Sequence, residues 1–100
     1  MGVEKMNKAY LVAHIRVHDK VAYEKFKAMS GPAISMYNGK VLVRSPNPDF
    51  REGALRGLVI VIEFENMDSA RRFYESPEYT AARAIRETAA ETDLMLIEGV

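Results

Sequence analysis

The sequence predicts an α+β domain with the element order β-α-β-β-α-β. Four segments show the alternating or continuous apolar pattern of strands, and two longer segments repeat apolar residues every three or four positions, as helices do. Glycine, proline or asparagine stands at most of the boundaries between them. A length of 100 residues, of which 48% are hydrophobic, suits a single core. We therefore expect one domain over residues 6–100, preceded by a flexible leader at residues 1–5.

The first strand and the first helix follow from two successive patterns. Residues 9–18 alternate between two faces. One face carries Leu11, Ala13, Ile15 and Val17, and the other carries Tyr10, Val12, His14, Arg16 and His18. Asp19 can then cap a helix. The buried side of this helix is formed by Ala22, Phe26, Met29 and Ala33. Because proline lacks an amide donor, we expect a kink at Pro32, a second short piece capped by Ser30, and an end near Gly39.

The second and third strands lie in the middle of the chain. Residues 39–45 form the second strand, which ends at Pro46 and Pro48 because neither a strand interior nor a helix interior tolerates proline well. Residues 57–64 are nearly all aliphatic. Such a run is typical of a central strand that is covered on both faces of its sheet.

The second helical segment is expected in two pieces. The first begins with a cap at Asn66 or Asp68. The second begins at Ser76 and Pro77, since serine is a favoured cap and proline is favoured at the first helical position. Residues 93–100 form the closing strand. The buried side of the first piece is expected to hold Ala70, Phe73 and Tyr74. In the second piece Tyr79, Ala82, Ile85, Arg86 and Ala89 follow at helical spacing.

This order is that of the ferredoxin-like fold, in which two right-handed crossovers place both helices on one face of a four-stranded antiparallel sheet. The other face is free. Because a buried charge is costly, we expect the charged strand residues there. The expected free face holds Tyr10, Val12, His14, Arg16, Leu42, Arg44, Val59, Val61 and Glu63. A face this aliphatic usually marks an interface, so we expect a second copy of the chain to pack on it as a twofold homodimer.

Six segments carry a resemblance to a known family. They are Tyr10-Leu-Val-Ala-His-Ile-Arg-Val-His-Asp19, the Tyr23 helix with Gly31-Pro32-Ala-Ile34, Gly39-Lys-Val-Leu-Val-Arg44, Val61-Ile-Glu-Phe64, Ser76-Pro77-Glu78-Tyr79 and Ile97-Glu-Gly-Val100. Over residues 6–100 they resemble the bacterial domain of unknown function 1330 family. The family usually has glycines after the second strand, where this chain has Ser45-Pro46-Asn-Pro48.

The resemblance implies a dimeric α+β barrel, in which two sheets close into a barrel across the dimer. Relatives with this fold include cofactor-free monooxygenases, muconolactone-type isomerases, haem-dependent chlorite dismutases and ligand-sensing domains of transcription regulators. The resemblance brings no established reaction for the family itself, and a shared fold does not supply one.

His14 and Glu63 are the candidate catalytic pair, because a carboxylate beside an imidazole orients it as a general base needs. Arg16 and Arg44 are candidate ligand-binding residues, since guanidinium groups match the geometry of a carboxylate. Tyr79 is a further candidate at the edge of a pocket. The alternative is that these groups only satisfy one another inside a dimer interface. The remaining helix arginines are expected to be solvated, namely Arg71, Arg72, Arg83 and Arg86.

Composition and charge exclude several classes of function. With 14 basic and 14 acidic residues, the chain lacks the basic field of a nucleic-acid binder. Without cysteine it has no disulfide and no cysteine-ligated zinc. His14 and His18 are about 13 Å apart on a strand, too far to share one metal ion. A lone histidine can ligate haem, but no other feature of the sequence indicates haem. We therefore expect no metal and no cofactor. No apolar run is long enough to cross a bilayer, and we expect a cytoplasmic protein.

The sequence therefore predicts a homodimer that binds a small anionic or aromatic organic ligand between its sheet and its helices. One use of such a site is cofactor-independent acid/base or monooxygenase-like chemistry, with His14 as the base, Glu63 as its orienter, and Arg16 and Arg44 as anion contacts. The alternative is a non-catalytic ligand-sensing or stress-associated module. The sequence alone does not decide whether the protein is an enzyme.

Overall fold

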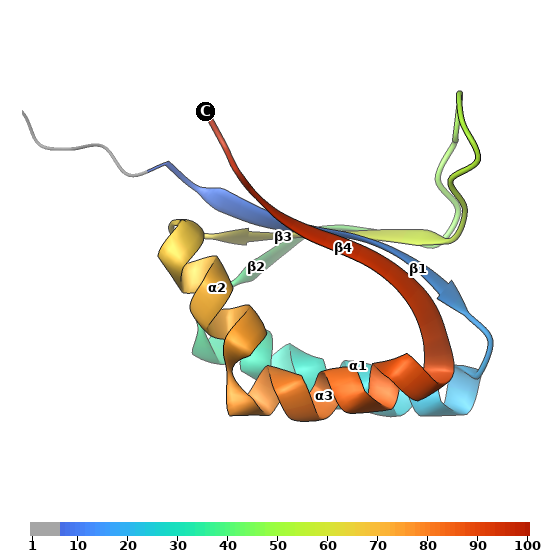
Figure 1. Ribbon diagram of the computed structural model, residues 1–100, viewed down its shortest axis with the longest axis horizontal. Helices are drawn as coiled ribbons and strands as arrows, with labels where there is room; N and C mark the ends of the chain where they lie inside the picture. Colours follow the sequence, from blue (N-terminus) through green and yellow to red (C-terminus); the bar gives the residue numbers. More distant parts are fainter. Residues whose placement is uncertain (1–6) are drawn as a thin grey trace, which may run out of the picture.

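The structure is a computed structural model that describes residues 7–100 as a four-stranded antiparallel sheet with three helices (Figure 1). Its elements are β1 (Ala9–Val17), α1 (Lys20–Met36), β2 (Lys40–Ser45), β3 (Leu58–Phe64), α2 (Met67–Glu75), α3 (Pro77–Ala89) and β4 (Ala90–Glu98). The strand order β2-β3-β1-β4 places β3 and β1 in the centre. The predicted α+β, ferredoxin-like fold is confirmed. The expected leader at residues 1–5 lies outside the described residues.

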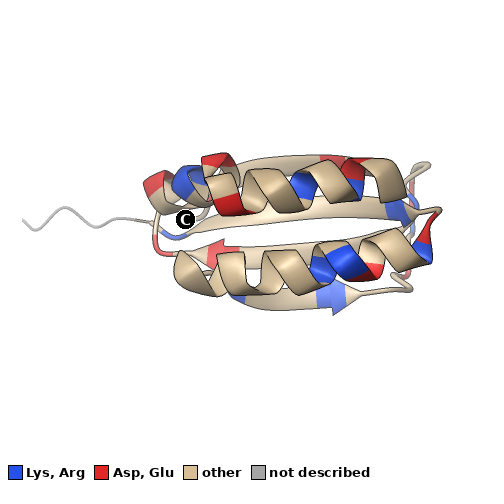
Figure 2. Cartoon of the chain, turned by 90° about the horizontal axis from the view of Figure 1, so that it is seen from below, with Lys and Arg blue, Asp and Glu red and all other residues tan. Residues whose placement is uncertain are grey.

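The helices form one layer on one side of the sheet. Seen from the helix side, α1 runs beside α3, and acidic and basic residues are interspersed along both helices (Figure 2). The connection between β2 and β3, residues 46–57, rises from the sheet on the side away from the helices (Figure 1). Over residues 7–100, no described element covers that side of the sheet, and no helix has the length and apolarity needed to cross a membrane.

Helix α1 begins as predicted but continues without a break through Pro32. The side chain of Asp19 accepts a hydrogen bond from the amide of Ala22 at 3.1 Å and so caps the helix. The predicted interruption is wrong, because Pro32 lies on the exposed side of the helix. There, water can solvate the carbonyl oxygen of Ala28 that loses its amide partner. Ser30 is not a cap; its hydroxyl donates to the carbonyl oxygen of Lys27 at 3.4 Å inside the helix.

The second helical segment is divided as expected. Asn66 caps α2 by accepting from the amide of Ser69 at 2.9 Å. Ser76 caps α3, since its hydroxyl oxygen accepts from the amide of Tyr79 at 3.1 Å. The same hydroxyl donates to the carbonyl oxygen of Phe73 at 2.7 Å, which joins the two helices at a buried point.

Strand β4 begins at Ala90, three residues earlier than the sequence suggested. The strand follows α3 directly, and the Ala89 carbonyl oxygen accepts from the amides of His18 and Asp19 at 2.9 and 3.1 Å. These hydrogen bonds tie the start of β4 to the end of β1. The first residues of β4 are too polar to signal a strand by themselves.

The core lies between the sheet and the helix layer. Alternate residues of β1 are buried there, as predicted, and Ile62 and Phe64 of β3 join them. Phe73 of α2 is fully buried, 5.1 Å from the Phe64 ring and 4.4 Å from the Tyr79 ring between centroids. One expectation for the helices is wrong: Arg86 of α3 is only 5% exposed, so it is part of this interior rather than solvated.

Candidate ligand-binding site

The register of β1 against β3 separates His14 from Glu63. Tyr10 lies opposite Glu63, whereas His14 lies opposite Val59. The two expected partners are thus four residue pairs apart, about 13 Å along the strands. Glu63 instead accepts a hydrogen bond from the Tyr10 hydroxyl at 3.2 Å. Desolvation raises the pKa of Tyr10, and this hydrogen bond raises it further. The expected contact between His14 and Glu63 is not formed within the chain.

The acidic partner of Arg16 comes from β4. Arg16 forms an ion pair with Asp93 at 3.0 Å between Nη2 and Oδ2, and Asp93 also lies opposite His14 in the strand pairing. The Asp93 side chain is 71% exposed, so this pair is weak as it stands. Sequence reasoning missed Asp93 because the two faces of β4 are almost equally apolar. His14, Arg16, Glu63 and Asp93 all point away from the helices.

Arg44 lies on the other side of the sheet from its expected position. Val41 pairs with Ile62, but the next pairs are Val43 with Val61 and Arg44 with Ile60. The extra residue, Leu42, forms a β-bulge that shifts the alternation by one position. Arg44 therefore shares the helix-facing side with Ile60 and not the free face.

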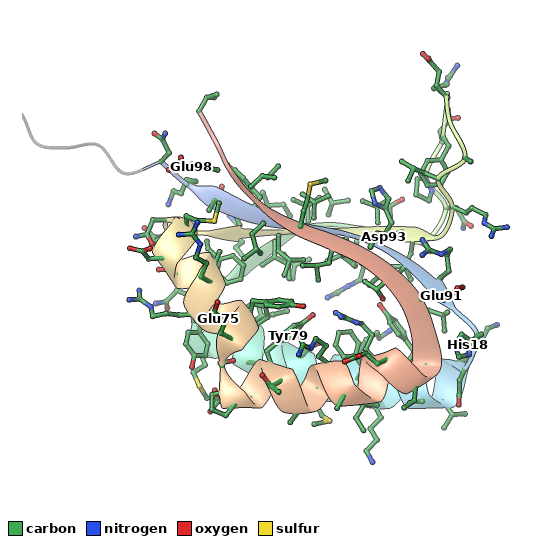
Figure 3. The ribbon with its side chains drawn as sticks, viewed as in Figure 1. His18, Glu75, Tyr79, Glu91, Asp93 and Glu98 are labelled. Atoms are coloured by element: carbon green, nitrogen blue, oxygen red, sulfur yellow. The ribbon has the colours of Figure 1, made fainter. Side chains whose placement is uncertain are left out.

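A pocket opens between the sheet and the helices α1 and α3. Its empty volume is about 460 Å³ including its open mouth. Its walls are mainly apolar and aromatic, formed by Leu11, Ala13, Ile15, Tyr23, Phe26, Ile34, Val41, Ile60, Ile62, Tyr79 and Leu94. The polar lining consists of Ser30, Lys27, Arg44 and Arg86, and no aspartate or glutamate of residues 7–100 lines the pocket. We call this space the interlayer pocket. Figure 3 shows Tyr79 reaching from α3 into the space between the two layers.

Arg86 is the buried charge of the interlayer pocket. Its Nη1 donates to the Tyr79 hydroxyl at 2.5 Å, and its guanidinium carbon lies 5.6 Å from the Phe26 ring centroid. Among the described residues, no carboxylate lies within ion-pair distance of Arg86. Burial raises the pKa of Tyr79, and the charge of Arg86 opposes this only in part. Helical spacing puts Arg86 on the same side of α3 as Tyr79 and Ala82. This spacing could have predicted that Arg86 is buried, although arginine usually lies in solvent.

The mouth of the interlayer pocket lies between α1 and β2. An adjoining pocket shares Tyr23, Lys27, Arg44 and Ile60 with it and is completed by Pro46 and Leu58. The side chains of Lys27 and Arg44 are exposed there. Burial raises the pKa of Tyr23, although the nearby charge of Arg44 lowers it. A ligand entering from solvent therefore passes two cationic side chains before it reaches the apolar walls.

The described residues contain no group of three or more histidine, aspartate or glutamate side chains that could hold a metal ion. Of the five residues expected to form a site, the structure brings Arg44 and Tyr79 to the interlayer pocket. It places His14, Arg16 and Glu63 on the opposite face of the sheet.

Comparison with solved structures identifies several proteins with the same architecture. A protein of unknown function from Rhodopseudomonas palustris superposes with a TM-score of 0.79 at 16% identity, over 96% of this chain and 85% of that one. SnoaB, a cofactor-independent oxygenase from Streptomyces nogalater, gives 0.69 at 13% identity over 94% of each chain. A dimeric ferredoxin-like protein of unknown function from Thermobifida fusca gives 0.61 at 15% identity, over 97% and 95%. At these identities the likeness shows the fold.

A comparison with curated protein sequences gives no match. The model of the family described as "Domain of unknown function (DUF1330)" matches residues 8–100. That match covers nearly the whole chain and agrees with the resemblance carried by its sequence motifs. The chain belongs to the DUF1330 family.

Proposed function

We propose that this protein binds a small organic anion with an apolar or aromatic body in the interlayer pocket. The observation that carries the proposal is the buried guanidinium of Arg86, which lines a mainly apolar pocket and has no carboxylate within ion-pair distance among residues 7–100. A buried charge without a counter-charge is strongly unfavourable, and an anionic ligand would supply that counter-charge. Lys27 and Arg44 at the mouth add positive charge of the same sign.

The walls favour a ligand with a flat or branched hydrocarbon body. The aromatic rings of Tyr23, Phe26 and Tyr79 come from the helices, and aliphatic side chains come from the sheet. Pockets that bind small molecules are mostly apolar, with a few fixed polar groups. The hydrogen bond from Arg86 fixes the Tyr79 hydroxyl, so that this hydroxyl can orient an acceptor on the ligand.

We further propose that the protein acts as a homodimer through the free face of the sheet. Val43, Met95 and Ile97 expose 39–50% of their surface there, and Val12 and Val61 lie between them in the strand pairing. Apolar side chains gathered on one face usually mark an interface. Relatives with this fold from Thermobifida fusca and Bacteroides fragilis are described as dimeric, which supports the proposal. We assign His14, Arg16 and Glu63 to this contact rather than to the pocket.

Two uses of the bound ligand can be separated by experiment. Cofactor-independent oxygenation is supported by the fold shared with SnoaB and with a putative antibiotic biosynthesis monooxygenase from Caulobacter crescentus. Among the side chains that line the interlayer pocket, the hydroxyl groups of Tyr23, Ser30 and Tyr79 and the ammonium group of Lys27 could exchange a proton. Oxygen uptake with phenolic acids, compared between the wild type and Tyr79→Phe, tests this use. Ligand binding without oxygen uptake would identify a sensing module instead.

Binding is tested by thermal denaturation with matched pairs of ligands. 2-Naphthoate and phenylacetate carry a carboxylate, and their amides present the same hydrocarbon body without the charge. A ligand at 100-fold excess over its Kd should raise the Tm by about 5 °C or more. We expect the acids to do so and the amides not. Arg86→Met should lose the shift, whereas Arg71→Met, at an exposed arginine of α2, should keep it.

Equal shifts with acids and amides would contradict the role of charge. An unchanged shift in Arg86→Met would contradict the role of Arg86.

A further inference from the structure

A second pocket lies on the other side of Arg86, between α3 and β4. It is lined by Tyr74, Arg83, Arg86, Glu87, Ala90 and Thr92, and its empty volume is about 720 Å³ including its open mouth. Unlike the interlayer pocket, its lining is mostly polar. We call it the α3–β4 pocket. Arg86 is the residue common to both pockets.

Two residues that line the α3–β4 pocket each carry a buried polar atom without a hydrogen-bond partner. These atoms are Nε of Arg86 and Oγ1 of Thr92, and no other buried side-chain nitrogen or oxygen in residues 7–100 lacks a partner. Leaving a buried donor unpaired costs about 1–3 kcal/mol, and more for a charged group. Because both atoms belong to residues that line this one pocket, a bound group there is the candidate that would complete their hydrogen bonds.

The chemistry of these two atoms specifies the missing group. The N–H of Arg86 can only donate, and the Thr92 hydroxyl can donate alongside it. Both donors are satisfied by a group with two acceptor oxygens, such as a carboxylate or a phosphate. The Nη1 of Arg86 already donates to Tyr79, whereas the N–H of Nε has no partner within the described residues and is available to this group.

The charges around the α3–β4 pocket favour an anion. Arg83 lies at the pocket with Nη1 donating to the Tyr74 hydroxyl at 2.7 Å, which holds its charge in place. The opposing charge is Glu87, whose Oε1 lies 3.6 Å from the Nε of Arg83 and whose side chain is 65% exposed. Two arginines thus face one solvated carboxylate, and the lining has a net positive charge.

We propose that the α3–β4 pocket is a binding site for a small oxyanion, held by Nε of Arg86 and Oγ1 of Thr92. This inference rests on the same Arg86 as the proposed function, but it concerns the Nε atom and the different set of neighbours in the α3–β4 pocket. The oxyanion is either a free ion or the charged end of the organic ligand. In both cases the same two atoms hold it.

The test follows the side-chain Nε–Hε resonance of Arg86 by nuclear magnetic resonance in the full chain. Acetate and inorganic phosphate are added in turn, with chloride keeping the ionic strength constant. We expect a saturable shift of the Arg86 resonance and a smaller response from the exposed Arg71. Thr92→Val keeps the shape of the side chain but removes the hydroxyl, and should weaken binding about tenfold. Thr80→Val, at an exposed position of α3, serves as the matched control and should bind as the wild type does.

A second arm identifies the source of the oxyanion. Acetate that competes with 2-naphthoate for the Arg86 resonance would show that the charged end of the organic ligand occupies the site. If acetate and 2-naphthoate instead shift the Arg86 resonance additively and do not compete, the site binds a free ion. An Arg86 resonance that does not respond to acetate or phosphate would overturn the proposal and assign the unpaired atoms to ordered water. Equal affinities in the wild type and Thr92→Val would also overturn it. The acetate titration gives its answer even if no naphthoate binds, so its failure is distinct from failure of the proposed function.

Discussion

Arg86 donates a hydrogen bond to the hydroxyl of Tyr79 from the same side of α3, two helical turns away. Both side chains are at least 95% buried, and the Tyr79 ring also packs on Phe73 at 4.4 Å between centroids. The aromatic core thereby fixes the position of the tyrosine, and the tyrosine fixes one side of the guanidinium. A polar pair that is held this firmly can serve a ligand without first being ordered.

Replacement of Arg86 by methionine should leave the free energy of unfolding within about 1 kcal/mol of the wild type, or raise it. The reason is that a buried charge without a partner is often replaced by an apolar side chain at no net cost. The change also leaves the Tyr79 hydroxyl without its donor. The double variant Arg86→Met/Tyr79→Phe should therefore be more stable than Arg86→Met by about 1 kcal/mol. Urea unfolding of the two variants measures both differences. A loss above about 3 kcal/mol in Arg86→Met would mean that Arg86 has a structural partner.

Stability should fall at alkaline pH because of Tyr79. The pKa of Tyr79 is raised in the folded state, chiefly by burial, above the value of about 10 that tyrosine has in an unfolded chain. The contribution of the neutral Tyr79 hydroxyl to the free energy of unfolding is thus fully present below about pH 10. It is lost as the pH rises through the folded-state pKa. Urea unfolding between pH 8 and pH 11.5 should show this decline. Tyr79→Phe should reduce the decline, while Tyr37→Phe, at a half-exposed tyrosine, should leave it as in the wild type. If the free energy of unfolding fell equally steeply with pH in the wild type and in Tyr79→Phe, the decline could not be assigned to Tyr79.

Local sequence signals are sufficient to predict the fold. The alternation of residues 9–18 predicts both the strand and its two faces, because the period of a strand leaves each side chain one choice of side. Asp19 and Ser76 are recognisable as caps because their side chains satisfy amides only three residues away. Such signals depend on neighbours in the sequence, and so they can be read before the tertiary structure is known.

The candidate site depends on relationships that no local signal contains. The separation of His14 from Glu63 is set by the register of β1 against β3. The position of Arg44 is set by a bulge at Leu42, which moves every later residue of β2 to the opposite face. Arg86 was misassigned for a different reason: helical spacing indicated burial, but a buried arginine is rare enough that composition argued against it. Arg86 is an exception to the rule that arginines lie at the surface, and the proposed site depends on it.

Replacement of Pro32 by alanine should stabilise the protein by about 1–3 kcal/mol. The proline lies inside α1 and removes one hydrogen bond from the helix, and an alanine would restore the amide donor at an exposed position. Part of this gain is offset, since proline also restricts the unfolded chain. Gly31→Ala is the matched control. An added Cβ at Gly31 has no atom within 4 Å, and its gain should be about 1 kcal/mol from helix propensity alone. Denaturant unfolding of the two variants measures which of them gains more free energy of unfolding. A destabilised Pro32→Ala variant would show that the proline shapes the helix in a way that packing requires.

Replacement of Gly57 by alanine should be far more costly than the same change at Gly53. Both glycines have positive φ values, +99° and +85°, so both substitutions carry the backbone penalty of about 1–2 kcal/mol. A Cβ at Gly57 would in addition collide with the carbonyl oxygen of Ile15, whereas a Cβ at Gly53 has no atom within 4 Å. Since Gly57 lies beside β1 where β3 begins, its substitution should also disturb the pairing of these two central strands. Hydrogen exchange of the β1 and β3 amides, together with urea unfolding, measures both effects. Equal losses at the two glycines would contradict the close contact at Gly57.

If the chain forms the proposed dimer through the free face of the sheet, a single charge placed on that face should prevent dimerisation. Met95 is 50% exposed on this face and pairs with Val12, so Met95→Lys would bury two ammonium groups in a twofold interface. The dimer dissociation constant should rise about 100-fold or more. Val21→Lys is the control, because Val21 is 83% exposed on α1, on the opposite side of the molecule, and should leave the dimer intact. Sedimentation velocity over a range of concentrations distinguishes the two variants. A monomeric wild type, or a Met95→Lys variant as dimeric as the wild type, would mean that the apolar side chains of the free face serve another purpose.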